Sequence, residues 1–156
     1  MQTIWITGGS SGIGFATAKE FINNNWQVVI SSSNKIKLES AKKKLELNNN
    51  NKNLVHAIVC DISSKNNVDE TINSIEKNIG KIDIALLNAS AYSPNKNQIF
   101  DISNYELLVD VNIKGTLYCV NKLKDVMKNR NNTIAIISSP LGYRGWPTAG
   151  AYGISK

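Results

Sequence analysis

Short apolar runs alternate with longer amphipathic segments along almost the whole chain. The apolar runs predict buried strands at 4–6, 27–31, 54–60, 82–88 and 133–138. Between them, apolar positions repeat with helical spacing at 15–22, 34–47, 65–78 and 103–130. Strands that alternate with helices in this way are typical of β-α-β units, in which helices cover both faces of a parallel sheet. The pattern therefore predicts an α/β fold with a doubly wound, Rossmann-like parallel sheet.

Two polar stretches are expected to be loops: residues 48–53 and the segment around Pro94. Ser103 and Glu106 form a Ser-x2-Glu capping box, which predicts that the fourth helix begins there and continues to about residue 130. Ligands of doubly wound sheets bind beyond the carboxyl ends of the strands. We therefore expect the functional residues to lie at these strand ends.

A glycine-rich turn follows the first predicted strand and leads into the first predicted helix. Gly8, Gly12 and Gly14 would let the backbone turn tightly, approach a pyrophosphate closely and pack the helix against the strand. The start of the helix would present free N–H groups and a partial positive charge to the phosphates. The spacing Gly-x3-Gly-x-Gly differs from the usual Gly-x-Gly-x2-Gly fingerprint, so this motif alone also fits an ordinary glycine loop.

The end of the second predicted strand bears on the choice of cofactor. An acidic residue there would bind the adenosine 2′-hydroxyl of NAD, but the sequence has Ser32 and Ser33 and no acid before Glu39. Hydroxyl groups and the nearby Lys35 and Lys37 suit a 2′-phosphate, although no arginine is present for a bidentate contact. NADP is therefore predicted in preference to NAD, and the alternative for both lysines is plain helix solvation.

Tyr152 and Lys156, at the end of the chain, are candidates for catalysis. Residues four apart lie on one face of a helix, so the lysine ammonium can stand near the phenol and favour its ionised form. Two other Tyr-x3-Lys pairs occur: one begins at Tyr92 and contains a proline, and the other begins at Tyr118. Only Tyr152 has a serine, Ser139, thirteen residues before it at the end of a predicted strand, where the following proline favours an extended backbone.

Length and composition favour a single domain over residues 1–156, because a chain of this length with 42% hydrophobic residues can form one core. The formal charge of +6 raises nucleic-acid binding as a hypothesis. Lysines 42–44 point around a helix, however, and no aromatic residues are interspersed among them. A solvated helix face explains these lysines better, and no nucleic-acid partner is predicted.

The cysteines bear on metal binding, and the start of the chain bears on targeting and membrane insertion. Cys60 and Cys119 are far apart and, with one histidine, make a poor metal set, so no metal is predicted and both thiols are expected to be buried and reduced. The chain starts without a basic leader, and no apolar run is long enough to cross a bilayer. A cytoplasmic protein without membrane contact is the expectation.

Taken together, these residues resemble the short-chain dehydrogenase/reductase family over essentially the whole chain. The turn at 7–14 matches the cofactor motif of the family's compact branch, and Asp61 matches the residue that family members use against the adenine ring. Residues 87–90, Leu-Asn-Ala-Ser, stand where the family usually has Asn-Asn-Ala-Gly. The predicted cofactor contacts are Gly8, Ser10, Ser11, Gly12, Ile13, Gly14, Ser32, Ser33, Asp61, Ile62, Asn88, Ala89, Tyr152 and Lys156.

The resemblance extends to the family's catalytic residues, here Asn112, Ser139, Tyr152 and Lys156. It implies hydride transfer between C4 of a nicotinamide and a carbonyl or secondary alcohol carbon of a small molecule. Tyr152 would act as general acid/base, and Ser139 would hydrogen-bond the substrate oxygen. Lys156 would favour ionised Tyr152 and hold the nicotinamide ribose. Asn112 would position a water that links this lysine to solvent.

The sequence departs from the family pattern in two places. Leu87 and Ser90 replace an asparagine and a glycine, so weaker or slightly shifted cofactor binding is expected. Family members continue beyond the position of Lys156, so the carboxy-terminal part of the fold is expected to be missing, with most of the substrate pocket and a surface for homo-oligomers of a full-length form. The alternatives to an enzyme are a dinucleotide-binding sensor without catalysis and an inactive truncated remnant.

Overall fold

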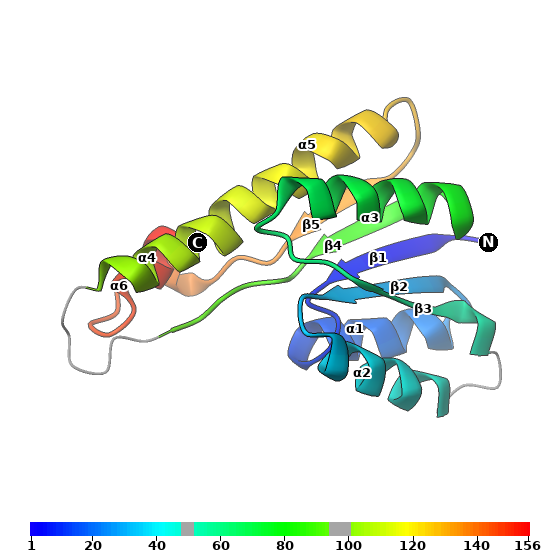
Figure 1. Cartoon of the computed structure of the whole chain (residues 1–156), viewed down its shortest axis with the longest axis horizontal. Coiled ribbons are helices and arrows are strands. Elements are labelled where there is room, and N and C mark those ends of the chain that lie inside the picture. Colours follow the sequence, from blue (N-terminus) through cyan, green and yellow to red (C-terminus); the bar gives the residue numbers. More distant parts are fainter. Residues whose placement is uncertain (48–51, 94–100) are drawn as a thin grey trace.

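The computed structural model describes residues 1–47, 52–93 and 101–156, which contain one five-stranded parallel sheet in the order β3-β2-β1-β4-β5 (Figure 1). The chain moves outward from β1 to β3 and then returns to the other side of β1 with β4. This reversal of strand order confirms the doubly wound sheet that the sequence predicts. The strands are β1 (Thr3–Thr7), β2 (Gln27–Ser32), β3 (Val55–Val59), β4 (Ile82–Leu87) and β5 (Thr133–Ile136).

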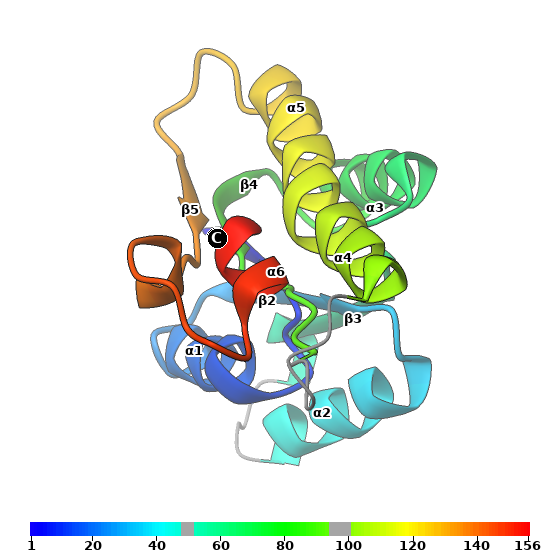
Figure 2. The same ribbon diagram turned by 90° about the vertical axis from the view of Figure 1, so that its left-hand side faces the viewer.

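Helices cover both faces of the sheet, as predicted (Figures 1 and 2). One face carries α1 (Gly12–Asn23) and α2 (Lys35–Leu47). The other carries α3 (Lys65–Asn78) and a continuous helical segment made of α4 (Ile102–Leu108), a π-helical turn (Val109–Gly115) and α5 (Thr116–Val126). The shorter elements are the 3-10 turns Lys52–Leu54 and Pro140–Gly142 and the helix α6 (Gly150–Ile154).

The central strand β1 shows how the two layers of the core form. All five of its residues are buried, and successive side chains point to opposite faces of the sheet. Ile4 and Ile6 pack against α1 and α2, whereas Trp5 packs against α3 and α5. The fully buried Trp5 donates its indole N–H to Ser31 Oγ at 3.0 Å, so its one polar atom is satisfied.

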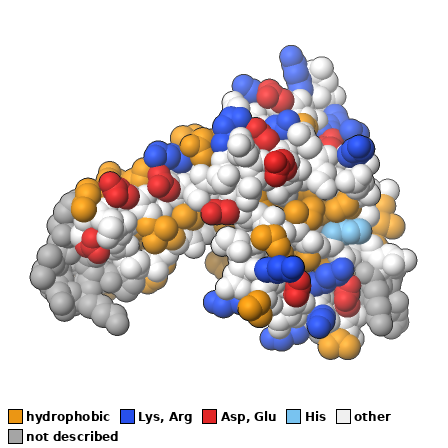
Figure 3. All heavy atoms as spheres, in the orientation of Figure 1, with side chains coloured by type: hydrophobic (Ala, Val, Ile, Leu, Met, Phe, Trp, Pro, Cys, Tyr) orange, Lys and Arg blue, Asp and Glu red, His pale blue; other side chains and the backbone are white. Residues whose placement is uncertain are grey.

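The lysine-rich helix α2 has the solvated face that the sequence predicts. Its buried stripe consists of Leu38, Ala41 and Leu45, and its lysines lie outside this stripe. Two of these lysines form ion pairs with an acidic residue one helical turn away. Lys35 Nζ lies 3.9 Å from Glu39 Oε1, and a second i,i+4 pair joins residues 42 and 46. Blue and red side chains accordingly lie side by side over this part of the surface in Figure 3.

The start predicted for the fourth helix is wrong. Asp101 caps α4: its Oδ1 accepts from the backbone N–H of Ser103 at 3.0 Å and from the Ser103 hydroxyl at 2.7 Å. A carboxylate is a stronger acceptor than a hydroxyl, so Ser103 lies inside the helix and does not cap it. The helical segment also ends earlier than residue 130, with Met127 as its C-cap and Asn129 in the left-handed region at φ 62°.

Three strands are shorter than predicted, since β3 and β4 each end one residue early and β5 ends two residues early. The fifth strand ends at Ile136, although the N–H of Ile137 still donates to the carbonyl of Leu87 at 3.0 Å. The last helix, α6, has five residues and ends at Ile154, before Lys156. The predicted loop around Pro94 lies outside the described residues, as do residues 48–51 of the predicted loop at 48–53.

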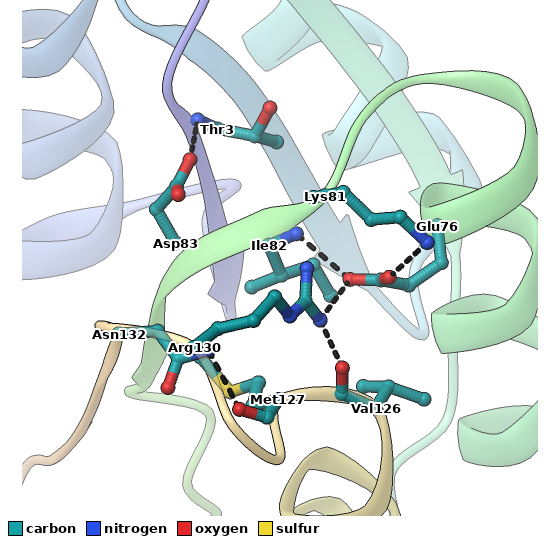
Figure 4. Close-up of polar contacts among 9 residues, drawn as sticks. All are labelled: Thr3, Glu76, Lys81, Ile82, Asp83, Val126, Met127, Arg130 and Asn132. Atoms are coloured by element: carbon teal, nitrogen blue, oxygen red, sulfur yellow. Dashed lines mark hydrogen bonds and ion pairs between the residues drawn. The ribbon is translucent and has the colours of Figure 1, made fainter.

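A cluster of polar contacts ties the amino-terminal side of β4 to the ends of α3 and α5 (Figure 4). Glu76 Oε1 accepts from the N–H of Ile82 at 2.8 Å and from Arg130 Nη2 at 3.1 Å, and Oε2 lies 3.1 Å from Lys81 Nζ. Burial raises the pKa of the Glu76 carboxyl, but these three hydrogen bonds outweigh burial and hold the pKa below its usual value. Glu76 therefore links the end of α3 to the start of β4, six residues further on, and to Arg130 beyond the end of α5.

Glu76→Gln is expected to lower the free energy of unfolding by about 2 kcal/mol at pH 7, because it removes a largely buried charge that three donors share. The carboxyl has a lower pKa in the folded than in the unfolded chain. Its contribution is therefore present above the usual value of 4.5 and is lost as the pH falls through the lower folded value. Urea unfolding between pH 7 and pH 3 should show the two proteins converging at low pH.

Glu70→Gln is the matched control, because Glu70 is exposed on the same helix. It should change the unfolding free energy by less than about 0.5 kcal/mol. Equal stability of Glu76→Gln and the unaltered protein at pH 7 would contradict the role given to Glu76.

Candidate functional site

A cavity of about 710 Å³ lies at the carboxyl edge of the sheet, where strand order reverses. It is lined by the turn after β1, the ends of β2 and β3, the loop after β4 and the helical segment around Leu107 and Val111. Figure 3 shows the surface hollowed between the arm formed by α4 and α6 and the body that carries α1 and α2. The predicted cofactor residues that line this cavity are Gly8, Ser10, Ser11, Gly12, Ile13, Ser32, Ser33, Asp61, Ile62, Asn88 and Ala89.

The glycines of the turn after β1 meet different requirements. Gly8 and Gly12 have φ values of 65° and 54°, which side chains rarely adopt. Gly14 is buried behind the cavity, and a Cβ there would lie 2.6 Å from the carbonyl oxygen of Gly8 and 2.7 Å from Nδ2 of Asn88. The turn therefore needs glycine twice for backbone conformation and once for close packing.

Thr7 and Asn88 hold the ends of the two central strands together. The hydroxyl of Thr7 accepts from the backbone N–H groups of Asn88 and Ala89, both at 3.0 Å. The Asn88 side chain donates back to the carbonyls of Thr7 at 3.1 Å and Gly8 at 3.2 Å. These four bonds fix the cavity floor at the point where β1 and β4 diverge.

The amino terminus of α1 opens into this cavity. Ser11, the N-cap, has an extended backbone and makes no capping bond with its side chain. The first α-helical bond is donated by Phe15 to the carbonyl of Ser11 at 3.2 Å, so the preceding N–H groups are not used within the helix. Ser11, Gly12 and Ile13 all line the cavity, so this end of α1 can bind an anionic group there.

The segment after β2 places one lysine at the cavity and turns another away. Ser32 Oγ accepts from the N–H of Asn34 at 3.2 Å, and Asn34 Oδ1 accepts from the N–H of Lys37 at 2.9 Å, which starts α2. Lys37 lines the cavity, whereas the exposed Lys35 pairs with Glu39. Among the described lining residues, Lys37 and Asp61 are the charged ones, and the Asp61 carboxylate accepts from the Ser63 N–H at 3.0 Å.

Asn112 lies in the middle of the π-helical turn, is buried, and uses all four hydrogen-bonding positions of its side chain. Oδ1 accepts from the Ala91 N–H at 2.8 Å and from the Ser90 hydroxyl at 3.1 Å. Nδ2 donates to the Ala91 carbonyl at 3.0 Å and to Ser155 Oγ at 2.8 Å. The hydroxyl of Ser90, which replaces the family's usual glycine, thus turns toward Asn112. The backbone carbonyl of Asn112 accepts from Thr116 Oγ1 at 2.8 Å.

Tyr152 and Lys156 lie close together at the end of the chain, as their spacing predicts. Lys156 Nζ is 5.5 Å from the centroid of the Tyr152 ring and donates to the carbonyl of Ile137 at 3.1 Å. Burial lowers the pKa of the Lys156 ammonium. The Tyr152 ring also makes an edge-to-face contact with Tyr92, with centroids 4.9 Å apart.

Ser139 follows β5 in the extended conformation expected before a proline, with φ −147° and ψ 149°. Its hydroxyl accepts from the N–H of Leu141 at 3.2 Å and caps the short 3-10 turn. This turn packs tightly against the end of the chain, because a Cβ on Gly142 would lie 2.8 Å from the carbonyl carbon of Lys156. Ser139 and Lys156 thus belong to neighbouring segments.

A second cavity of about 240 Å³ meets the first at Ala89, which lines both. Asn112 and Lys156 line it together with Ser138 and Ser155. Tyr152 and Ser139 belong to neither lining, although their segments adjoin this cavity. Of the four predicted catalytic residues, the structure thus places Asn112 and Lys156 in one cavity lining, whereas Ser139 and Tyr152 lie outside both linings.

Several lining residues were not identified from the sequence as cofactor contacts. Leu107 and Val111 stand four apart on the helical segment above the cavity, a spacing that marks one helix face without saying what that face contacts. Cys60 also lines the cavity, and burial raises the pKa of its thiol. Burial raises the pKa of Cys119 to about 12. Both cysteines are free and buried, as predicted, and their thiols are poor nucleophiles at neutral pH.

Within residues 1–47, 52–93 and 101–156, no three His, Cys, Asp or Glu side chains are grouped as ligands of a metal ion. None of the helices in the described part of the chain is both long and apolar enough to span a membrane.

The chain belongs to the short-chain dehydrogenase family, whose family model matches residues 2–156. An uncharacterized oxidoreductase of Staphylococcus saprophyticus is 30% identical over 152 residues, which cover 97% of this chain and 64% of that relative. A similar relative from Staphylococcus aureus strain MW2 is 28% identical with the same coverage. The chain therefore spans 64% of the length of these curated relatives.

Solved structures share this fold. A short chain dehydrogenase from Bacillus anthracis matches with a TM-score of 0.92 at 23% identity, covering 99% of this chain and 62% of that one. The closed form of a serine dehydrogenase complexed with NADP+ matches with a TM-score of 0.87 at 22% identity, covering 99% of this chain and 61% of that one. At this level of identity the likeness concerns the fold alone.

Gly14→Ala is expected to lower the free energy of unfolding by about 1–3 kcal/mol, because the new methyl group would displace the Gly8 carbonyl and the Asn88 side chain. Gly145→Ala is the control, since no heavy atom lies within 4 Å of its added Cβ. Urea unfolding of both variants measures the difference. A Gly14→Ala protein as stable as the control would show that the close packing of the turn is not required.

Proposed function

We propose that residues 1–156 form a single dinucleotide-binding domain of an NAD(P)-dependent oxidoreductase that acts on a carbonyl or secondary alcohol group of a small molecule. The main support is one hydrogen-bonded network. Through Asn112, this network joins Ser90 and Ala91, which line the larger cavity, to the segment that carries Tyr152 and Lys156. A cofactor site and a candidate acid/base group are thereby connected in one structure.

The residues of the larger cavity fit a nicotinamide dinucleotide. The uncapped start of α1 suits the pyrophosphate, and Gly12 presents no side chain to it in the cavity lining. Asp61 and Ile62 would bind at the adenine end, and Asn88 and Ala89 near the nicotinamide end. When bound, the nicotinamide supplies the hydride donor or acceptor.

We favour NADP over NAD because the lining after β2 contains hydroxyl groups and one lysine. Ser32, Ser33 and Lys37 line the cavity, and α2 begins there without an acid in its first turn. A 2′-phosphate would gain a charge-assisted hydrogen bond from the Lys37 ammonium. The solved serine dehydrogenase with NADP+ shows that this fold accommodates that cofactor in another protein.

For the reaction, Tyr152 would transfer a proton to or from the substrate oxygen. Lys156 Nζ, 5.5 Å from the centroid of the Tyr152 ring, places a cation beside the tyrosine that would exchange this proton. Ser139 would donate its hydroxyl proton to the same substrate oxygen, because that hydroxyl only accepts in its contact with Leu141. Asn112 would contribute by holding the surrounding segments, since its side-chain positions are already occupied.

The alternative is a sensor that binds the dinucleotide without turnover. It shares the cavity but gives Tyr152 no chemical role, so binding and turnover must be measured separately. A homo-oligomer and a substrate pocket completed by further polypeptide remain part of the proposal for a longer form, because relatives exceed this chain in length.

Tyr152→Phe is expected to lower the rate of NADPH consumption with a panel of ketones and aldehydes by about 100-fold or more, because the proton donor is lost. NADPH binding, followed by its fluorescence, should change little. Tyr118→Phe is the control, since Tyr118 has a lysine at the same spacing but lies on α5. Tight NADPH binding without turnover by the unaltered protein would instead favour the sensor.

Lys37→Ala is expected to weaken NADPH binding roughly tenfold and to leave NADH binding within about twofold, because only NADPH carries the 2′-phosphate. Lys35→Ala on the same helix should affect neither, since that lysine faces Glu39. Dissociation constants from fluorescence titration test both variants. Equal losses for the two cofactors would exclude Lys37 as the residue that discriminates between them.

A further inference from the structure

The hydroxyl of Ser155 occupies a junction between two parts of the candidate site. Ser155 is buried, with 9% of its surface exposed. Its Oγ donates to the backbone carbonyl of Tyr152 at 2.8 Å and accepts from Asn112 Nδ2, also at 2.8 Å. The single hydroxyl proton is used toward Tyr152, so the contact with Asn112 requires a donor on the asparagine side.

The surroundings of Asn112 determine that it presents its NH₂ group to Ser155. The N–H of Ala91 can only donate, so the atom 2.8 Å from it must be the carboxamide oxygen. The NH₂ group therefore points to the Ala91 carbonyl and to Ser155. Each donor in this set of hydrogen bonds faces an acceptor, so Asn112 is the donor and Ser155 Oγ the acceptor in the bond between them.

We propose that Ser155 is a positioning residue that couples the carboxamide of Asn112 to the backbone of the segment carrying Tyr152 and Lys156. This inference rests on the proposed oxidoreductase function. The coupling has a physical basis, because α6 has only five residues and too few internal hydrogen bonds to be rigid by itself. A buried contact to the π-helical turn supplies the restraint that the short helix lacks.

The same contact connects Tyr152 to the cofactor cavity. Asn112 binds Ser90 and Ala91, which line that cavity, so Ser155 connects this loop to α6 through Asn112, in addition to the ring contact of Tyr92 with Tyr152. In the described part of the chain, Lys156 and Tyr92 are the titratable groups placed against the Tyr152 ring. A displaced α6 would change the distance from the Lys156 ammonium to the phenol, and with it the pH dependence of the reaction.

The test compares Ser155→Ala, which removes the hydroxyl, with Ser155→Thr, which keeps it. In the whole protein, Ser155→Ala should lower kcat about tenfold with the KM for NADPH within about twofold, and should displace the pH–rate profile to higher pH. Ser155→Thr should restore most of kcat and the original profile. Ser74→Ala is the control, because Ser74 also engages a side chain, that of Asn78, but lies on α3.

A second measurement needs no turnover and so separates this inference from the proposed function. With ring-fluorinated tyrosine, the Tyr152 resonance can be assigned by its loss in Tyr152→Phe. Ser155→Ala should broaden or shift that resonance, whereas Ser74→Ala should not.

An unchanged resonance together with an unchanged pH–rate profile would overturn the positioning role. A loss of thermal stability alone would also overturn it, because a purely structural serine would have that effect. If the unaltered protein shows no turnover, the oxidoreductase proposal fails, and the fluorine resonance alone then decides whether Ser155 positions Tyr152.

Discussion

The arrangement of the site depends first on the contact between the ends of β1 and β4. Two parallel strands must separate at their carboxyl ends before a cavity can open between them. The backbone N–H and C=O groups at each end then need other hydrogen-bond partners. Thr7 and Asn88 satisfy those groups reciprocally, with the hydroxyl of one binding the loop after β4 and the carboxamide of the other binding the turn after β1. Gly14 packs directly on this contact, which brings α1 close to the strand end.

Asn112 extends the same principle to the last segment of the chain. Its carboxamide is buried in the π-helical turn, and leaving any of its four hydrogen-bonding positions unmatched would be costly. The loop at Ala91 and the end of α6 therefore have to lie where their polar atoms meet it. The π-helical turn thus has an identifiable function, because it brings Asn112 between two segments that share no sequence proximity.

Charged side chains have different surroundings at the two edges of the sheet. At the edge away from the cavity, Glu76 is surrounded by cationic and N–H donors, so its charge stabilises the joined ends of α3 and β4. At the carboxyl edge, Lys37 lines the cavity and Lys156 lies near the Tyr152 ring and is partly buried. The Glu76 charge is thus neutralised within the fold, whereas the lining of the larger cavity carries the cation Lys37 and the anion Asp61.

The sequence by itself determined the fold class, the order of strands and helices, the glycine turn and the proximity of Tyr152 to Lys156. The fold features follow from local periodicity, and the proximity follows from a separation of four residues in one segment, although α6 itself ends at Ile154. It did not determine the cap at Asp101 or the π-helical turn. Alternative N-cap residues, and α-helical and π-helical backbones, differ little in free energy, so packing against the rest of the chain selects between them. The contacts of Ser155, Ser90 and Leu107 likewise required the tertiary structure, since each side chain meets partners brought near only when the whole chain folds.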